Sequence, residues 1–85
     1  MLKNIENEKL IGNFMKMKID YDKSKFYSSW DWLIPVCEEA CRHTKNVKCA
    51  VISEDIRFHV SRFNMDLAYK DLIRFIKEYN KQKQS

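Results

Sequence analysis

The chain has 85 residues, of which 45% are hydrophobic, with one glycine, one proline and three cysteines. This length fits one small domain, and the composition excludes a low-complexity or disulfide-rich protein. The net charge of +4 is smaller than expected for a protein that packages nucleic acid, and all of it arises in residues 45–85.

A short helix is predicted near the N-terminus, from about residue 6 to residue 17. Its apolar residues recur at helical spacing: Leu10, Ile11, Phe14 and Met15. The next segment, KIDYDKSKFYS, is compatible with a short pair of strands around residues 22–24.

A second helix is predicted to begin just before Trp30, because Ser28 and Asp31 fit a capping box. One face of this helix carries Trp30, Leu33, Ile34, Val36, Cys37, Ala40 and Cys41. Trp30 is therefore expected in the core, whereas Trp32 lies at the edge of this face. Two interpretations of Trp32 stay open: it covers a neighbouring element, or it anchors a partner, since tryptophan is enriched in binding hot spots.

Two strands are predicted between residues 47 and 60. Apolar and other residues alternate in the runs VKCAVIS and IRFHV, which flank Glu54 and Asp55. The alternating apolar positions are Val47, Cys49 and Val51, then Ile56, Phe58 and Val60. A period of two on each side of a short polar turn predicts a β-hairpin.

The last helix is predicted from about Met65 to Asn80, and it has the clearest pattern. Its broad apolar stripe consists of Met65, Ala68, Tyr69, Leu72, Ile73, Phe75, Ile76 and Tyr79. Together, these elements predict an α+β fold in which a small antiparallel sheet packs against about three helices. Residues 1–80 are expected to form the single domain, and residues 81–85 a flexible basic tail.

Basic residues on the last helix recur at i, i+4, i+7 and i+11, namely Lys70, Arg74, Lys77 and Lys81. They share one face, which Arg57 and His59 are expected to join from the outer face of the hairpin. This pattern is typical of a solvated face, and it also fits a binding surface for phosphate groups or for an acidic protein surface. With Trp32, these residues form the candidate partner-binding site.

The cysteines and histidines do not indicate a metal site. Cys37 and Cys41 lie on an apolar helix face, where free cysteine behaves as a small hydrophobe, and the spacings are not those of structural zinc sites. A nucleophilic pair of Cys49 and His59 across the hairpin lacks a visible activating group. We therefore predict no cofactor, no metal and no enzymatic activity.

Two segments, SSWDWLIPVCEEA and LAYKDLIRFIKEYN, resemble small orphan proteins found in phages, prophages and mobile elements of Bacteroidetes bacteria. The similarity covers a KLIGNFM-like helix at residues 9–15, a SWDWL-x-P-V helix start at residues 29–36 and an EFIKWYN-like last helix at residues 72–80. It does not extend well through the middle of the chain. Since the group has no settled activity, the resemblance implies no catalytic residues, only a setting inside an invaded bacterial cell.

This setting leads to the expected function. We expect a non-enzymatic inhibitor of the anti-CRISPR kind, which binds a host protein or ribonucleoprotein effector such as an RNA-guided nuclease. Contact with nucleic acid through the basic face is expected to be weak. The alternative is a small nucleic-acid-binding or regulatory protein of the phage. The first residues are not expected to act as a signal peptide, and no apolar run reaches the ~18–20 residues of a membrane span. The expected location is therefore the host cytoplasm, without membrane contact.

Overall fold

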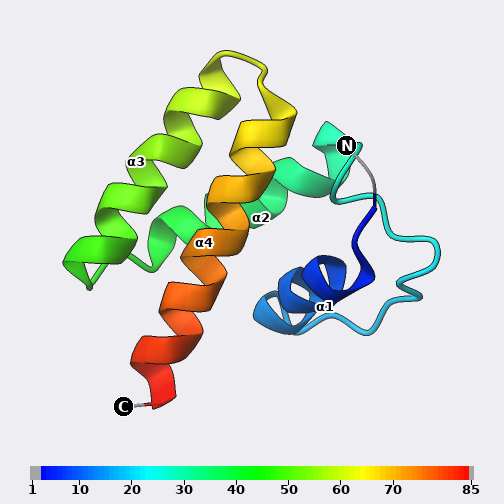
Figure 1. Ribbon diagram of the computed structural model, residues 1–85, viewed down its shortest axis with the longest axis horizontal. Helices are drawn as coiled ribbons and strands as arrows, with labels where there is room; N and C mark the ends of the chain where they lie inside the picture. Colours follow the sequence, from blue (N-terminus) through cyan, green and yellow to red (C-terminus); the bar gives the residue numbers. More distant parts are fainter. Residues whose placement is uncertain (1–2, 85) are drawn as a thin grey trace.

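The chain folds into helices, as a computed structural model shows for residues 3–84, with side chains described up to residue 82 (Figure 1). The helices are α1 (Ile5–Phe14), α2 (Trp30–Arg42), α3 (Val47–Ser61) and α4 (Met65–Gln84). No strand occurs among the described residues. The predicted α+β fold is therefore wrong, and the architecture is all-α.

α3 and α4 form an antiparallel helical hairpin, and α2 crosses behind α4 and contacts both helices (Figure 1). α1 packs against α4 on the other side of the molecule, so α4 contacts every other helix. The buried apolar residues form one cluster around α4, and its fully buried members include Ile11, Leu33, Ile56, Leu72, Phe75 and Ile76. Within residues 3–84, no helix is both long enough and apolar enough to cross a bilayer.

The main correction to the sequence prediction is α3, which replaces the expected β-hairpin. Asn46 caps this helix, because its side-chain oxygen accepts hydrogen bonds from the backbone N–H groups of Lys48 (2.8 Å) and Cys49 (3.4 Å). The buried residues of α3 are Cys49, Ile52, Ser53 and Ile56. Their spacings of three, one and three positions place them on one helix face.

Three of the six apolar side chains that suggested strands are left exposed by α3. Val47 is 77% exposed, Val51 55% and Phe58 53%. The segment satisfies a period of two and a helical spacing at the same time, and packing against α4 selects the helix. Three large apolar side chains consequently remain at the surface, where they are available to a partner.

The other elements differ from the prediction mainly at their ends. α1 ends at Phe14 because Lys16 adopts a left-handed conformation (φ 56°), and the predicted strands near residue 22 are turns. α2 begins at Trp30 as predicted, but its N-cap is Ser29 and no side chain caps it, so the predicted capping box is wrong. α4 continues through residue 84, so residues 81–84 are helical; Ser85 lies outside the described residues.

One buried carboxylate connects α1 to α4. Glu8 is fully buried and accepts hydrogen bonds from the hydroxyl groups of Ser24 and Tyr69, each at 2.8 Å. Every buried side-chain polar atom among the described residues has a hydrogen-bond partner. The interior polar groups are thus satisfied within the fold.

Candidate binding surface

The basic residues predicted on the last helix lie on one exposed stripe of α4. Lys70, Arg74, Lys77 and Lys81 are all exposed, opposite the buried side that faces the core. Among the described residues, no carboxylate forms an ion pair with Lys70, Lys77 or Lys81. The positive charge of these three lysines is therefore not neutralised by the residues that the structure describes.

A groove of about 510 Å³ runs between α3 and α4, and we call it the α3–α4 groove. Val47, Val51 and Ile52 supply its apolar lining from α3. Its charged lining consists of Lys48, Arg74, Lys77, Glu78 and Lys81. The groove thus combines two exposed valines with a mainly basic rim, and it contains three of the seven predicted site residues.

Asp71 of α4 organises the polar contacts next to this groove. Its carboxylate lies 2.6 Å from Nδ1 of His59 and 3.0 Å from a guanidinium nitrogen of Arg74. Asp55 of α3 lies 4.0 Å from the same Arg74 nitrogen. His59 therefore faces α4 and joins the two helices, instead of lying on the outer face of a β-hairpin. Asp71 was not identified from the sequence, although it lies three positions before Arg74.

The remaining two predicted site residues lie elsewhere. Arg57 is exposed on a different side of α3, where it lines a second groove, between α2 and α3. Trp32 is half-buried on α2 and packs edge-on against the buried ring of Phe26, with ring centroids 5.1 Å apart. Trp32 thus covers a neighbouring segment, and a role as a partner anchor stays a prediction. The seven residues do not form one continuous surface.

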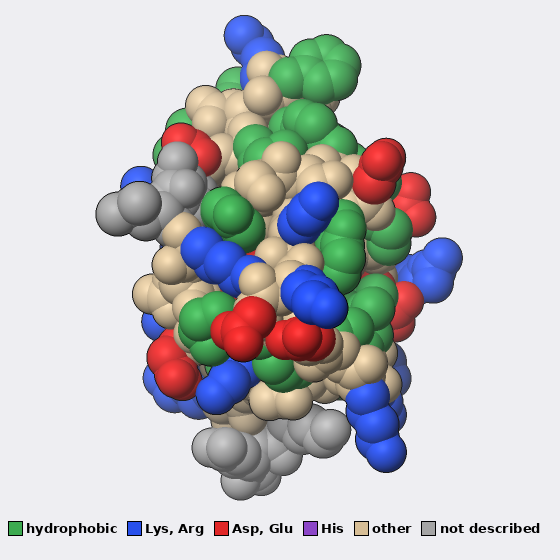
Figure 2. Space-filling model, turned by 90° about the vertical axis from the view of Figure 1, so that its right-hand side faces the viewer, with side chains coloured by type: hydrophobic (Ala, Val, Ile, Leu, Met, Phe, Trp, Pro, Cys, Tyr) green, Lys and Arg blue, Asp and Glu red, His purple; other side chains and the backbone are tan. Residues whose placement is uncertain are grey.

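Exposed aromatic residues gather where α3 turns into α4. Phe63 is 82% exposed and has a left-handed backbone (φ 55°), and the guanidinium of Arg62 lies 5.0 Å from the ring centre of Phe58. Hydrophobic side chains are visible at this upper end of the molecule in Figure 2. Below them, acidic and basic side chains are interspersed on the face shown. This face therefore carries mixed charge, whereas the exposed stripe of α4 carries several basic residues.

The fold buries Cys37 and separates the cysteine and the histidine that were considered as a nucleophilic pair. Burial, followed by the nearby Cys41 and Glu38, raises the pKa of the Cys37 thiol to about 12, so this thiol is protonated at neutral pH. Cys49 and His59 lie ten positions apart on one helix, which corresponds to about 15 Å along its axis. The nucleophilic pair considered across a β-hairpin is therefore not formed. Among the described residues, no three His, Cys, Asp or Glu side chains are grouped to hold a metal ion.

Comparison with protein-family models, with curated proteins and with solved structures gives no match for this chain. Functional inference consequently starts from the residues and contacts described above.

Proposed function

We propose that this is a binding protein without catalytic chemistry, and that its α3–α4 groove holds an acidic, amphipathic segment of a partner protein. The observation that carries the proposal is the position of Val47 and Val51 beside Lys48, Lys77 and Lys81. Burial of the exposed valines would favour binding through the hydrophobic effect, while the lysines would attract carboxylates and speed association.

The form of the groove suits a helical segment of the partner. Paired helices commonly bind an amphipathic helix along the groove between them. The basic stripe from Lys70 to Lys81 spans eleven positions, or about 16 Å of helix, which matches about three turns of a partner helix. Acidic residues on the sides of such a helix would reach the lysines, while its apolar residues would cover the valines.

A protein partner is favoured over nucleic acid by the other residues of the surface. Glu78 lines the groove and Asp55 lies beside Arg74, so the rim is not uniformly basic. A protein segment can place its acidic residues beside the lysines alone, whereas a phosphate backbone carries a negative charge at every nucleotide. Asp71 already binds the guanidinium of Arg74. No aromatic side chain lines the groove, whereas proteins that bind single strands stack bases on aromatic rings.

The resemblance to phage and mobile-element proteins supports a bacterial cell as the setting. We therefore propose that the partner belongs to a host defence machine, with an RNA-guided nuclease effector as the specific candidate. In this proposal the protein inhibits by occupying a surface that the effector needs. The alternative is a nucleic-acid-binding or regulatory protein of the phage. Such a protein would be expected to bind the oligonucleotide more tightly than the peptides in the experiment below.

The binding experiment uses three fluorescent probes: a helical peptide of glutamate and leucine, the same peptide with serine in place of leucine, and an oligonucleotide. Anisotropy should show the leucine peptide binding at least ten-fold more tightly than either other probe. The double variant Lys77→Glu with Lys81→Glu should lose this binding. Lys9→Glu with Lys25→Glu, which reverses two exposed lysines away from the groove, is the matched control.

Two results would contradict the proposal. Equal losses in the groove variant and in the control would mean that the groove is not the binding site. Tighter, sequence-dependent binding of the oligonucleotide would favour the nucleic-acid alternative. Inhibition of target cleavage by a purified RNA-guided nuclease, lost in the groove variant only, would support the more specific proposal.

A further inference from the structure

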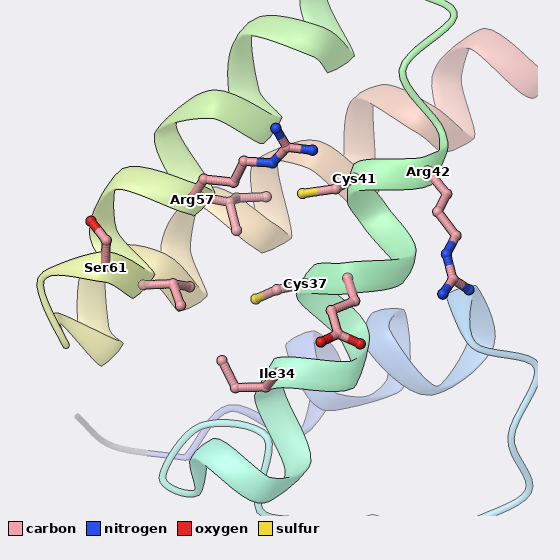
Figure 3. A pocket seen from close by; sticks show the side chains of 9 residues that line it. Ile34, Cys37, Cys41, Arg42, Arg57 and Ser61 are labelled. Atoms are coloured by element: carbon pink, nitrogen blue, oxygen red, sulfur yellow. The ribbon is translucent and has the colours of Figure 1, made fainter.

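A second groove, between α2 and α3, has an apolar floor (Figure 3). We call it the α2–α3 groove. It encloses about 440 Å³, which is within the ~300–1,000 Å³ typical of small-molecule sites. The floor is formed by Ile34, Cys37, Cys41, Ile56 and Val60. Because the pKa of Cys37 is raised to about 12, its thiol stays neutral and the floor carries no charge there.

Arg57 is the residue of this groove that points to a ligand. Figure 3 shows its side chain reaching from α3 toward α2, at the end of the groove where Cys41 lies. Its guanidinium forms neither a hydrogen bond nor an ion pair with any described residue. Arginine presents paired N–H donors that match the two oxygens of a carboxylate.

We propose that the α2–α3 groove binds a small aliphatic monocarboxylate, with the carboxylate on Arg57 and the chain lying over Cys37 toward Ile34. Four positions separate Cys37 from Cys41 and three separate it from Ile34. α2 therefore rises about 10 Å between the two ends of the groove, which matches a chain of roughly eight carbons. This site is separate from the α3–α4 groove and does not depend on the function proposed for it.

Two other charged residues, Arg42 and Glu38, line the same groove, and they indicate at which end the ligand carboxylate would bind. Arg42 points away from the groove in Figure 3 and is paired with Glu39 at 3.0 Å. Glu38 forms no ion pair with a described residue, so its carboxylate would repel an anionic ligand. The ligand carboxylate is consequently expected at the Arg57 end, and removal of the Glu38 charge should strengthen binding.

The test titrates the isotope-labelled full chain with octanoate and, separately, with octan-1-ol, while NMR records the amide shifts. Octanoate should shift the amides of residues 34–41 and 56–60 saturably and bind at least ten-fold more tightly than octanol. Arg57→Gln should weaken octanoate binding about ten-fold and leave octanol binding unchanged. Glu38→Gln should strengthen octanoate binding, and Arg62→Gln, at another exposed arginine, should change neither.

Several outcomes would overturn the proposal. Shifts that do not saturate, or that lie outside these two segments, would mean that octanoate does not occupy the groove. Equal affinities for octanoate and octanol in the unmodified protein would mean that Arg57 does not bind the carboxylate. An equal loss in Arg57→Gln and Arg62→Gln would mean that net charge, rather than this groove, attracts the ligand.

Discussion

The hydroxyl of Tyr69 donates a 2.8 Å hydrogen bond to the carboxylate of Glu8, and neither side chain is more than 2% exposed. The contact joins α4 to α1 across 61 positions of the chain. Ser24 donates to the other carboxylate oxygen, so both oxygens have a donor. Burial of a carboxylate without such donors would be strongly unfavourable. α1 can therefore pack with Glu8 buried only because these hydrogen bonds form.

Tyr69→Phe should therefore lower the free energy of unfolding by about 1–3 kcal/mol, because it leaves one oxygen of Glu8 buried without a donor. The ring and its packing are retained in this variant. Tyr79→Phe is the matched control, since the Tyr79 hydroxyl forms no hydrogen bond with a described residue. Urea denaturation followed by circular dichroism measures both. Similar losses in the two variants would mean that Glu8 does not need the Tyr69 hydroxyl.

Stability should fall in alkaline solution. Burial raises the pKa of Cys37 from 9.0 to about 12, and burial and Glu8 raise the pKa of Tyr69 well above 10.0. The folded state therefore favours the protonated forms. The two protonated groups contribute fully to the free energy of unfolding below their unfolded-state pKa values, and this contribution is lost as pH rises toward the folded-state values. For Cys37, the loss extends from about pH 9 to pH 12.

Urea denaturation between pH 8 and pH 10.5 measures this effect. The free energy of unfolding should decline above about pH 9, with at most about 1.4 kcal/mol per pH unit from each group. Cys37→Val should make the decline shallower, whereas Cys41→Val, on the same helix but half-buried, should keep most of it. An unchanged slope in Cys37→Val would contradict the assigned role of this thiol.

Phe63→Gly should stabilise the protein, although it removes a large aromatic side chain. The left-handed conformation of Phe63 costs a residue with a Cβ roughly 1–2 kcal/mol, and glycine adopts it readily. Little burial is lost, since Phe63 is 82% exposed. The matched change Phe58→Gly lies inside α3 and should destabilise by about 1 kcal/mol. Thermal unfolding should show opposite shifts, and a loss of stability in both variants would contradict this account.

The sequence predicts some helices much better than others, for reasons visible in particular residues. α4 shows a broad apolar stripe that only a helix can bury, so its type and exposed basic side follow from the pattern. In α3, the buried helical face includes the polar Ser53, while the exposed Val47, Val51 and Phe58 imitate a strand. Local periodicity cannot resolve this conflict, because contact with α4 decides it.

The parts of the candidate sites that lie on one helix could be predicted from the sequence, whereas the parts that depend on contacts between helices could not. The spacing of Lys70, Arg74, Lys77 and Lys81 is local to one helix, and their exposure follows from it. The valines beside them come from another helix, whose type was wrongly predicted. Asp71 lies at the edge of the apolar stripe of α4, and its contact with His59 depends on the pairing of two helices. Sequence spacing alone does not reveal such a contact.

That contact supports a final prediction about the junction of α3 and α4. Asp71 is 8% exposed and binds both His59 and Arg74, whereas the side chain of Arg74 is 58% exposed. The better buried contact should stabilise the fold more, because solvent screens the exposed ion pair. The His59–Asp71 pair is therefore expected to hold the helices together, with Arg74 contributing less.

His59→Gln and Asp71→Asn, alone and combined, should show a coupling free energy of about 1 kcal/mol in a double-mutant cycle measured by urea denaturation. Arg74→Gln should cost less than about 1 kcal/mol, because its ion pair is largely exposed. Glu54→Gln, at an exposed carboxylate of α3, is the control and should change little. If the His59 and Asp71 variants are additive while Arg74→Gln is the most destabilising, then Arg74 joins the two helices instead.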